Sequence, residues 1–60
     1  MRFRISQSRD GQFYFEIQTL GRFETIATSE RYTTKAALQR NIDYIRQGAE
    51  SATVDDQSGS

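Results

Sequence analysis

The stretch DGQFYFEI occupies residues 10–17 and joins a turn signal to a strand pattern. Asp10-Gly11 favours a tight hairpin turn, because glycine readily adopts the positive φ that such turns require. Apolar side chains then recur at every second position from Phe13 to Ile17, which predicts a strand over residues 12–18 with one buried face. The segment therefore predicts the second arm of an antiparallel hairpin.

Strand patterns flank this segment on both sides. Upstream, Phe3 and Ile5 alternate with polar neighbours and predict a strand over residues 2–7. Downstream, a second turn signal at residues 19–22 is followed by residues 23–29, whose aromatic and β-branched side chains predict a third strand. The alternation leaves the direction of Ile26 open. If Ile26 shares a face with Glu24, then Phe23 lies on the other face.

The pattern becomes helical after the pair Thr33-Thr34. A threonine hydroxyl can cap the free amides of a starting helix, and good helix formers follow it. Leu38, Ile42 and Ile45 are spaced i, i+4, i+7, so they form one apolar stripe aimed at the sheet. Gly48 stands where a left-handed cap would end the helix.

The predicted helix covers residues 34–47, and little apolar signal follows it. A lone Val54 gives weak support for a short strand over residues 52–55. Residues 57–60 are small and polar, so we expect a disordered tail after a single domain over residues 1–56. The order of elements predicts an α+β domain, in which one helix packs on one face of an antiparallel sheet.

Composition excludes several classes of protein. The chain has 60 residues, with eight basic and eight acidic side chains and no Cys, His, Trp or Pro. Thiolate or imidazole metal sites, disulfides and Cys or His nucleophiles are therefore ruled out. No apolar run approaches the ~20 residues of a membrane span. We expect a cytoplasmic protein with no cofactor, no metal and no membrane partner.

Four short motifs together resemble the YegP-like family of small uncharacterised proteins. They are DGQFYF at residues 10–15, IATSE at residues 26–30, YTTKAA at residues 32–37 and Asn41-Ile42. The resemblance implies a β3-α-β unit that occurs as tandem repeats or as two subunits, joined into one sheet with exchanged C-terminal strands. Since this chain carries one copy, the resemblance implies a homodimer.

The resemblance also implies the roles of particular residues. Ile26 is expected to face the helix, and residues 52–55 are expected to form the exchanged strand. The family brings no established activity, so we predict a non-enzymatic protein. The residues expected at the dimer interface are Ala52, Thr53, Val54, Leu38, Ile42 and Ile45.

Two groups of polar side chains resemble sites. Ser29, Glu30, Tyr32 and Lys35 gather at the strand-to-helix junction, where free helix amides can also hold an anion. We interpret this group as structural: Ser29 or Thr33 caps the helix, Glu30 complements its dipole, and Tyr32 packs beneath. The pair Asp55-Asp56 predicts no metal site, because oxygen-ligand sites need about six donors.

The second face of the predicted sheet has nothing in this chain to cover it. It presents Arg2, Arg4 and Tyr14, and also Phe23 if Ile26 points toward the helix. This is an arginine-plus-aromatic set of the kind that stacks single-stranded bases. Single-stranded nucleic-acid binding is therefore an alternative to the homodimer as the main role. A third alternative is an accessory subunit that docks a larger protein through Tyr14 and Phe23.

The charge distribution weakens the nucleic-acid alternative. Residues 1–46 hold eight basic and five acidic side chains, a net charge of +3, whereas residues 47–60 hold three acidic side chains and no basic one. Glu16 and Glu24 lie on or beside the open face and would repel phosphates. The leading prediction remains a non-enzymatic homodimer.

Overall fold

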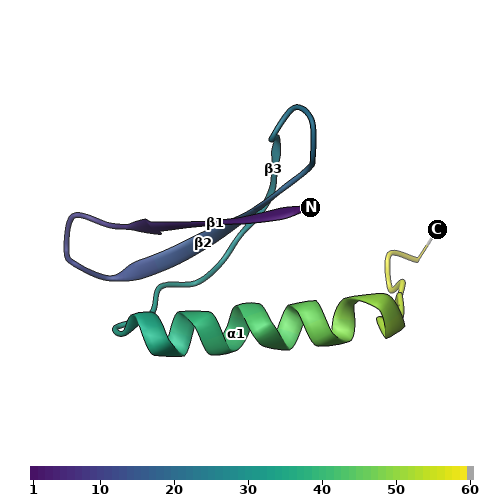
Figure 1. Ribbon diagram of the computed structural model, residues 1–60. Coiled ribbons are helices and arrows are strands. Elements are labelled where there is room, and N and C mark those ends of the chain that lie inside the picture. Colours follow the sequence, from purple (N-terminus) through teal and green to yellow (C-terminus); the bar gives the residue numbers. More distant parts are fainter. Residues whose placement is uncertain (60) are drawn as a thin grey trace.

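A computed structural model describes residues 1–59 and shows three strands and one α-helix (Figure 1). The strands form one antiparallel sheet in the order β1-β2-β3. The predicted α+β class is confirmed, with the helix on one face of the sheet. The elements are β1 (Arg2–Gln7), β2 (Phe13–Gln18), β3 (Thr25–Thr28), α1 (Lys35–Gly48) and the short 3-10 helix η1 (Ala49–Ser51).

The turn between β1 and β2 is the predicted hairpin turn. Gly11 has a φ of 86°, and its amide donates to the Ser8 carbonyl at 3.0 Å. The Asp10 carboxylate accepts hydrogen bonds from the Ser8 hydroxyl and from the Gln12 amide. These two bonds, the Ser8 bond first, lower the pKa of Asp10. The side chains of the turn thus fix the register of the hairpin.

β2 is the central strand, and its pairing with β3 is irregular. Ile17 lies opposite Ala27, but the next residue, Gln18, lies opposite Thr25, so Ile26 falls between the two pairs. Ile26 is 62 % exposed and lies outside the core cluster. The chain does not pack Ile26 against its own helix, which corrects the expectation. A local bulge of this kind breaks the alternation on which face assignments rest.

β3 is also shorter than the predicted strand over residues 23–29. The Thr19 amide donates to the Glu24 carbonyl at 2.9 Å, which assigns Glu24 to the turn. Phe23 adopts a φ of 55°, a left-handed conformation that is uncommon for a bulky residue. Phe23 therefore belongs to the turn before β3 and not to the strand.

α1 begins as predicted and ends differently. The Thr34 hydroxyl accepts a hydrogen bond from the Ala37 amide at 3.2 Å, so Thr34 is the cap. Gly48 has a φ of −100°, and the chain continues in a right-handed turn through η1. The left-handed cap expected at Gly48 is therefore wrong, because the turn of η1 keeps the same hand as the helix.

The core lies between the sheet and α1. Phe15, Leu38 and Ile42 are buried, and half-buried apolar side chains surround them. The Phe15 ring packs edge-on against Phe3 at 5.8 Å and is stacked on Tyr32 at 6.3 Å between centroids. The other face of the sheet carries no element (Figure 1).

The fourth strand expected over residues 52–55 is not formed. Within residues 1–59 no strand follows η1, and Val54 is 94 % exposed. Figure 1 shows this segment beyond the end of α1 and apart from the sheet, so its backbone has no strand edge of its own chain to pair with. Of the tail expected over residues 57–60, Ser60 lies outside the described residues. In the described part of the chain, no helix is long and apolar enough to cross a membrane.

Candidate functional site

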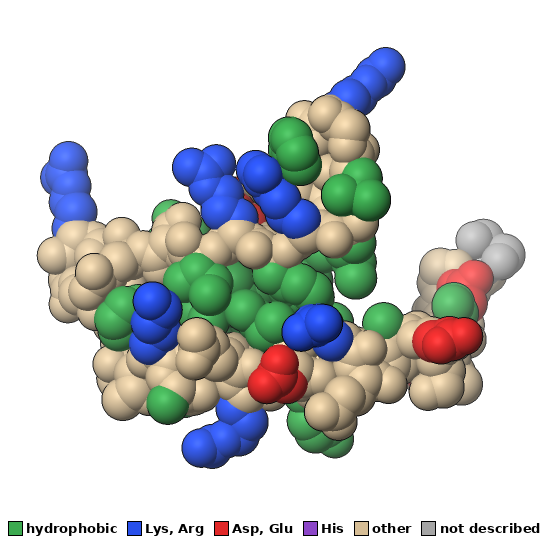
Figure 2. Space-filling model, in the orientation of Figure 1, with side chains coloured by type: hydrophobic (Ala, Val, Ile, Leu, Met, Phe, Trp, Pro, Cys, Tyr) green, Lys and Arg blue, Asp and Glu red, His purple; other side chains and the backbone are tan. Residues whose placement is uncertain are grey.

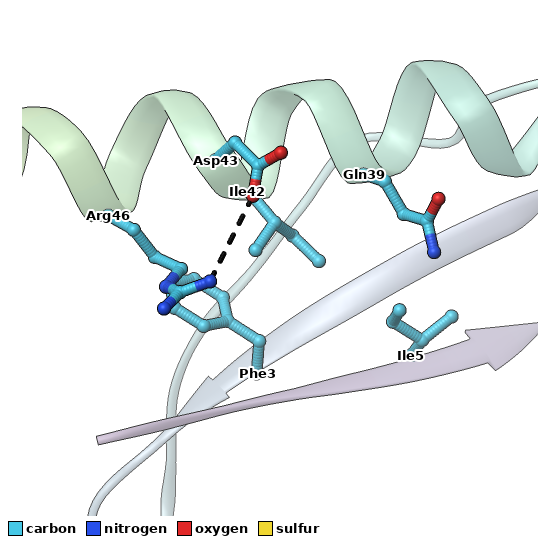
Figure 3. Close-up of a pocket in the computed structure, with 6 residues that line it drawn as sticks. All are labelled: Phe3, Ile5, Gln39, Ile42, Asp43 and Arg46. Atoms are coloured by element: carbon cyan, nitrogen blue, oxygen red, sulfur yellow. Dashed lines mark ion pairs between the residues drawn. The ribbon is translucent and has the colours of Figure 1, made fainter.

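A groove runs between β1 and α1 (Figure 3). Its volume is about 510 Å³, and Ile5, one of its apolar side chains, is 40 % exposed. Asp43 and Arg46 form an ion pair of 4.0 Å at its rim. The residues that line it are Phe3, Ile5, Gln39, Ile42, Asp43 and Arg46.

β1 is an edge strand, so the groove borders an unpaired backbone. β1 pairs with β2 on one side only, and in the described residues nothing pairs with its other side. An open edge beside exposed apolar side chains is the surface that an added strand would cover. The groove and the outer edge of β1 together are called the β1 surface below.

The structure divides the expected interface residues into two groups. Leu38 is fully buried in the core of its own chain, Ile42 is buried and borders the groove, and Ile45 is half-buried beside them. Residues 52–54 are exposed and lie near the C-terminus. The helix stripe is therefore assembled on the sheet, whereas residues 52–54 lie outside the core cluster.

On the open face, Arg2 is held in place from two directions. Its guanidinium carbon lies 3.7 Å from the centroid of the Phe23 ring, and its Nε donates to Gln18 Oε1 at 2.8 Å. Gln18 is only 4 % exposed. Its Nε2 donates in turn to the Thr25 hydroxyl at 3.2 Å, and that hydroxyl donates to Glu16 at 2.9 Å. Arg2 and Phe23 thus pack against each other, and hydrogen bonds through Gln18, Thr25 and Glu16 hold Arg2 in place.

Tyr14 does not join this pair. It lies four residues from Gln18 along β2, about 13 Å at the rise of a strand. The guanidinium of Arg31 lies 5.0 Å from its ring centroid. Arg31 is a loop residue that belongs to no periodic pattern, so no sequence signal indicates its role here. Arg4 lies between the two aromatic residues, opposite Glu16.

The open face is therefore not a continuous stacking platform. Each of its two aromatic rings already has a guanidinium group over one face. The arrangement presents guanidinium groups instead, whose planar donors match carboxylates and phosphates.

The side chains at the strand-to-helix junction have structural partners. The Ser29 hydroxyl accepts from the Phe15 amide at 2.9 Å and donates to the Glu30 carbonyl at 2.7 Å. The backbone of Tyr32 pairs with Phe13 through two hydrogen bonds of 2.7 and 2.8 Å. Burial raises the pKa of Tyr32, and the nearby Glu30 carboxylate adds a smaller rise.

This junction confirms part of the structural interpretation. Tyr32 packs against the core, as predicted. The cap is Thr34, however, and not Ser29 or Thr33, and no acidic residue lies in the first turn of α1, so the role expected for Glu30 is wrong. The helix begins only at Lys35, so the Ser29 hydroxyl and the Glu30 carboxylate lie too far back along the chain to reach its first amides.

Among residues 1–59, the acidic pair near the C-terminus bonds to its close neighbours in the sequence. Gln57 donates to Asp55 at 3.1 Å, and Ser58 donates to Asp56 from its amide at 2.9 Å and its hydroxyl at 2.6 Å. The Ser58 bonds lower the pKa of Asp56. Across residues 1–59, no three acidic side chains gather as a metal ion would require.

Comparison with known proteins points to one family. The domain of unknown function DUF1508 matches residues 8–56. The UPF0339 protein YegP of Shigella flexneri is 46 % identical over 44 residues, which are 73 % of this chain and 39 % of that protein. YegP of Escherichia coli strain K12 is 43 % identical over a match of the same extent. No solved structure gives a significant match.

Proposed function

We propose, from the premise that the chain belongs to the DUF1508 family and is similar to YegP, that it is a non-enzymatic cytoplasmic protein that acts as a homodimer. The family match confirms the resemblance that the sequence motifs indicated. In the proposed dimer, the C-terminal segment of each copy, residues 52–55, adds as a strand to the sheet of the other. The names of the relatives give no catalytic activity.

One observation carries the proposal, namely the exposure of Val54. Val54 is 94 % exposed in a segment that forms no strand among the described residues. Burial of a valine side chain contributes about 1.5–3 kcal/mol. The β1 surface of a second copy offers an unpaired strand edge with apolar side chains beside it. Strand addition would satisfy the edge and bury Val54 together.

The small core supports the proposal. Only Phe15, Leu38 and Ile42 are buried apolar residues among those described. Chains of this size bury a smaller share of their surface than larger domains, and association is one of the few remaining sources of burial when metals and disulfides are absent. A second copy would supply that burial.

The relatives give a second line of support. The match covers 39 % of YegP, so more than half of each relative lies outside it. That remainder is long enough for a second unit of this size. We infer that such relatives can build in one chain what this chain builds from two copies.

The oligomeric state tests the proposal by light scattering over a dilution series. We expect a mass of twice the 6.9 kDa of one chain. Val54→Ser should shift the mass toward one chain at low concentration. Tyr44→Ser is the matched control, because Tyr44 is also exposed, at 80 %, but lies on the helix away from the proposed strand. A mass of 6.9 kDa at every concentration would refute the dimer.

The absence of catalysis has a separate test. A broad screen for hydrolase and transferase turnover should give no activity above that of a buffer blank. Glu30 is the carboxylate at the strand-to-helix junction, so Glu30→Gln is the diagnostic variant. Reproducible turnover that disappears in Glu30→Gln would show that the protein is an enzyme.

A further inference from the structure

We propose that Arg2 is a preorganised receptor for carboxylate groups, and that its ligand is the acidic pair Asp55-Asp56 of a second copy of the chain. This inference rests on the homodimer proposed above and names a polar contact within it. The contact would act beside the burial of Val54.

Arg2 has donors left for a ligand. Its Nε is bonded to Gln18 and one face of its guanidinium lies on Phe23, which leaves the two terminal nitrogens at the free end of the group. Among the ion pairs of residues 1–59, none involves Arg2. A guanidinium offers these parallel donors in a planar fork, which fits both oxygens of a carboxylate.

The support of Arg2 reduces the cost of binding. A free arginine side chain carries about 2 kcal/mol of rotamer entropy, part of which is lost when it binds. Stacking on Phe23 and the bond to the buried Gln18 have already ordered Arg2. The nearby Glu16 carboxylate accepts from Thr25 and forms no ion pair with Arg2. The guanidinium is thus ordered but not neutralised.

The backbone of Phe23 points the same way. Its φ of 55° is unfavourable for a bulky side chain. Such strained positions cluster where a side chain has a functional placement. Here the strained residue is the one whose ring lies against Arg2.

Charge complementarity identifies the ligand. Residues 1–46 carry a net charge of +3 and residues 47–60 carry −3. Arg4 lies on the same face as Arg2, two residues along β1, so its Cα atom is about 7 Å from that of Arg2. Figure 2 shows Lys and Arg side chains on the outer side of the sheet, and Asp and Glu side chains both at the C-terminal end and on α1. The acidic C-terminal segment and the arginines of β1 therefore lie in different parts of one molecule.

A second copy is the favoured source of the carboxylates. Within residues 1–59 the acidic pair makes hydrogen bonds to Gln57 and Ser58, and its segment lies beyond the end of α1 (Figure 1). A strand added to the β1 edge of another copy would bring Asp55 and Asp56 next to the strand that carries Arg2. The proposed exchange thus joins the two charge regions.

The experiment measures the dissociation constant of the dimer at low and high salt by sedimentation equilibrium. Arg2→Lys keeps the charge but removes the Nε bond and the planar fork. We expect about a tenfold weaker dimer at low salt, a loss that corresponds to about 1.4 kcal/mol, and a smaller loss at high salt because salt screens exposed charges. Arg9→Lys is the matched control, since Arg9 lies in the exposed hairpin turn.

A second variant keeps the test valid if Arg2→Lys alters folding. Asp55→Asn with Asp56→Asn changes only an exposed segment and should weaken the dimer by the same factor. Adding Arg2→Lys to this variant should weaken the dimer no further, because the two changes remove one contact. Additive effects of the two changes would overturn the proposal.

Other outcomes separate this inference from the proposed function. A dimer whose dissociation constant is unchanged in Arg2→Lys refutes the receptor and leaves the homodimer intact. A monomer at all concentrations refutes the homodimer itself. A fluorescent oligothymidylate provides the remaining arm: if Arg2→Lys abolishes its binding without weakening the dimer, Arg2 binds phosphates and the proposal is wrong.

Discussion

Leu38 has no exposed surface and contacts the sheet from the middle of α1. Truncation of a buried leucine to alanine costs about 2–5 kcal/mol. Leu38→Ala should therefore lower the free energy of unfolding by this amount, as measured by urea denaturation. Leu20→Ala is the control: Leu20 is 69 % exposed, and its truncation should change stability by less than about 0.5 kcal/mol. Equal losses in the two variants would contradict the observed core.

Tyr32 makes the stability sensitive to alkaline pH. Its pKa is raised in the folded chain, so the phenol holds its proton more tightly when folded than when unfolded. The stabilisation is complete below the unfolded pKa and is lost as the pH rises through ~10 toward the folded value. Thermal melts between neutral and alkaline pH should show this loss in the wild type and a smaller one in Tyr32→Phe.

Tyr44→Phe serves as the control for that pH series. Tyr44 is 80 % exposed, so removal of its phenol should leave the alkaline loss of stability unchanged. If Tyr44→Phe flattened the pH dependence as much as Tyr32→Phe, the burial of Tyr32 would not be its cause.

Single residues also show the limit of prediction from sequence. The buried positions Phe15, Leu38 and Ile42 follow from two periodicities, because alternation and helical spacing both mark a buried face. The contact of Arg2 with Phe23 does not follow from either. It depends on a left-handed backbone at Phe23, which no periodic pattern encodes.

At the level of elements, the cap of α1 has a measurable contribution. The Thr34 hydroxyl accepts from the Ala37 amide, which satisfies one of the free amides of the first turn. Thr34→Ala should cost about 1 kcal/mol of stability in chemical denaturation. Thr33→Ala changes an equally exposed neighbour that is not the cap, and it should have little effect. A larger loss in Thr33→Ala would mean that the wrong hydroxyl has been identified.

Two glycines should respond to alanine with opposite signs. Neither position has an atom within 4 Å of an added Cβ, so the backbone decides. Gly11 has a φ of 86°, and Gly11→Ala should destabilise the β1–β2 turn by about 1–2 kcal/mol. Gly48 has a φ of −100° at the end of α1, and Gly48→Ala should stabilise it by about 0.4–1 kcal/mol. Thermal melts of both variants check the two signs.

The extent of the elements was predictable where one local pattern dominates. β1 has the predicted bounds, β2 differs from prediction by one residue at its start, and α1 differs by one residue at each end. β3 is shorter, because the turn bonds of Thr19 reach Glu24 and because the register shifts at Ile26. Bulges and turn closures arise from pairing with another strand, which a single segment of sequence does not record.

At the scale of the whole molecule, two truncations give contrasting predictions. Removal of residues 52–60 deletes Val54 and should lower stability by about 2 kcal/mol or more, the value of burying one valine side chain. Removal of residues 57–60 keeps Val54 and should be nearly silent. Thermal melts at equal protein concentration are required, since the stability of a dimer depends on that concentration. Equal melting temperatures for the two truncations would contradict strand exchange.

The proposed assembly was the part that the residues themselves predicted least well. A single valine gives no periodic signal, and within its own chain the segment around Val54 forms no strand. The expectation of a fourth strand had only weak support from Val54 and came mainly from the family resemblance. A strand that needs a partner chain has no local pattern that would reveal it.

The position of the C-terminal segment, beyond the end of α1 and apart from the sheet, also bears on polymerisation. A segment that leaves its own chain is free to add to the edge of any neighbour, and each neighbour offers its own segment in turn. A two-fold arrangement closes this series after two copies, whereas any other rotation continues it into a filament. In the proposed assembly, the direction in which the C-terminal segment leaves η1 would therefore decide between a closed dimer and a fibre, and we expect substitutions in residues 48–51 to be the first to cause fibre formation.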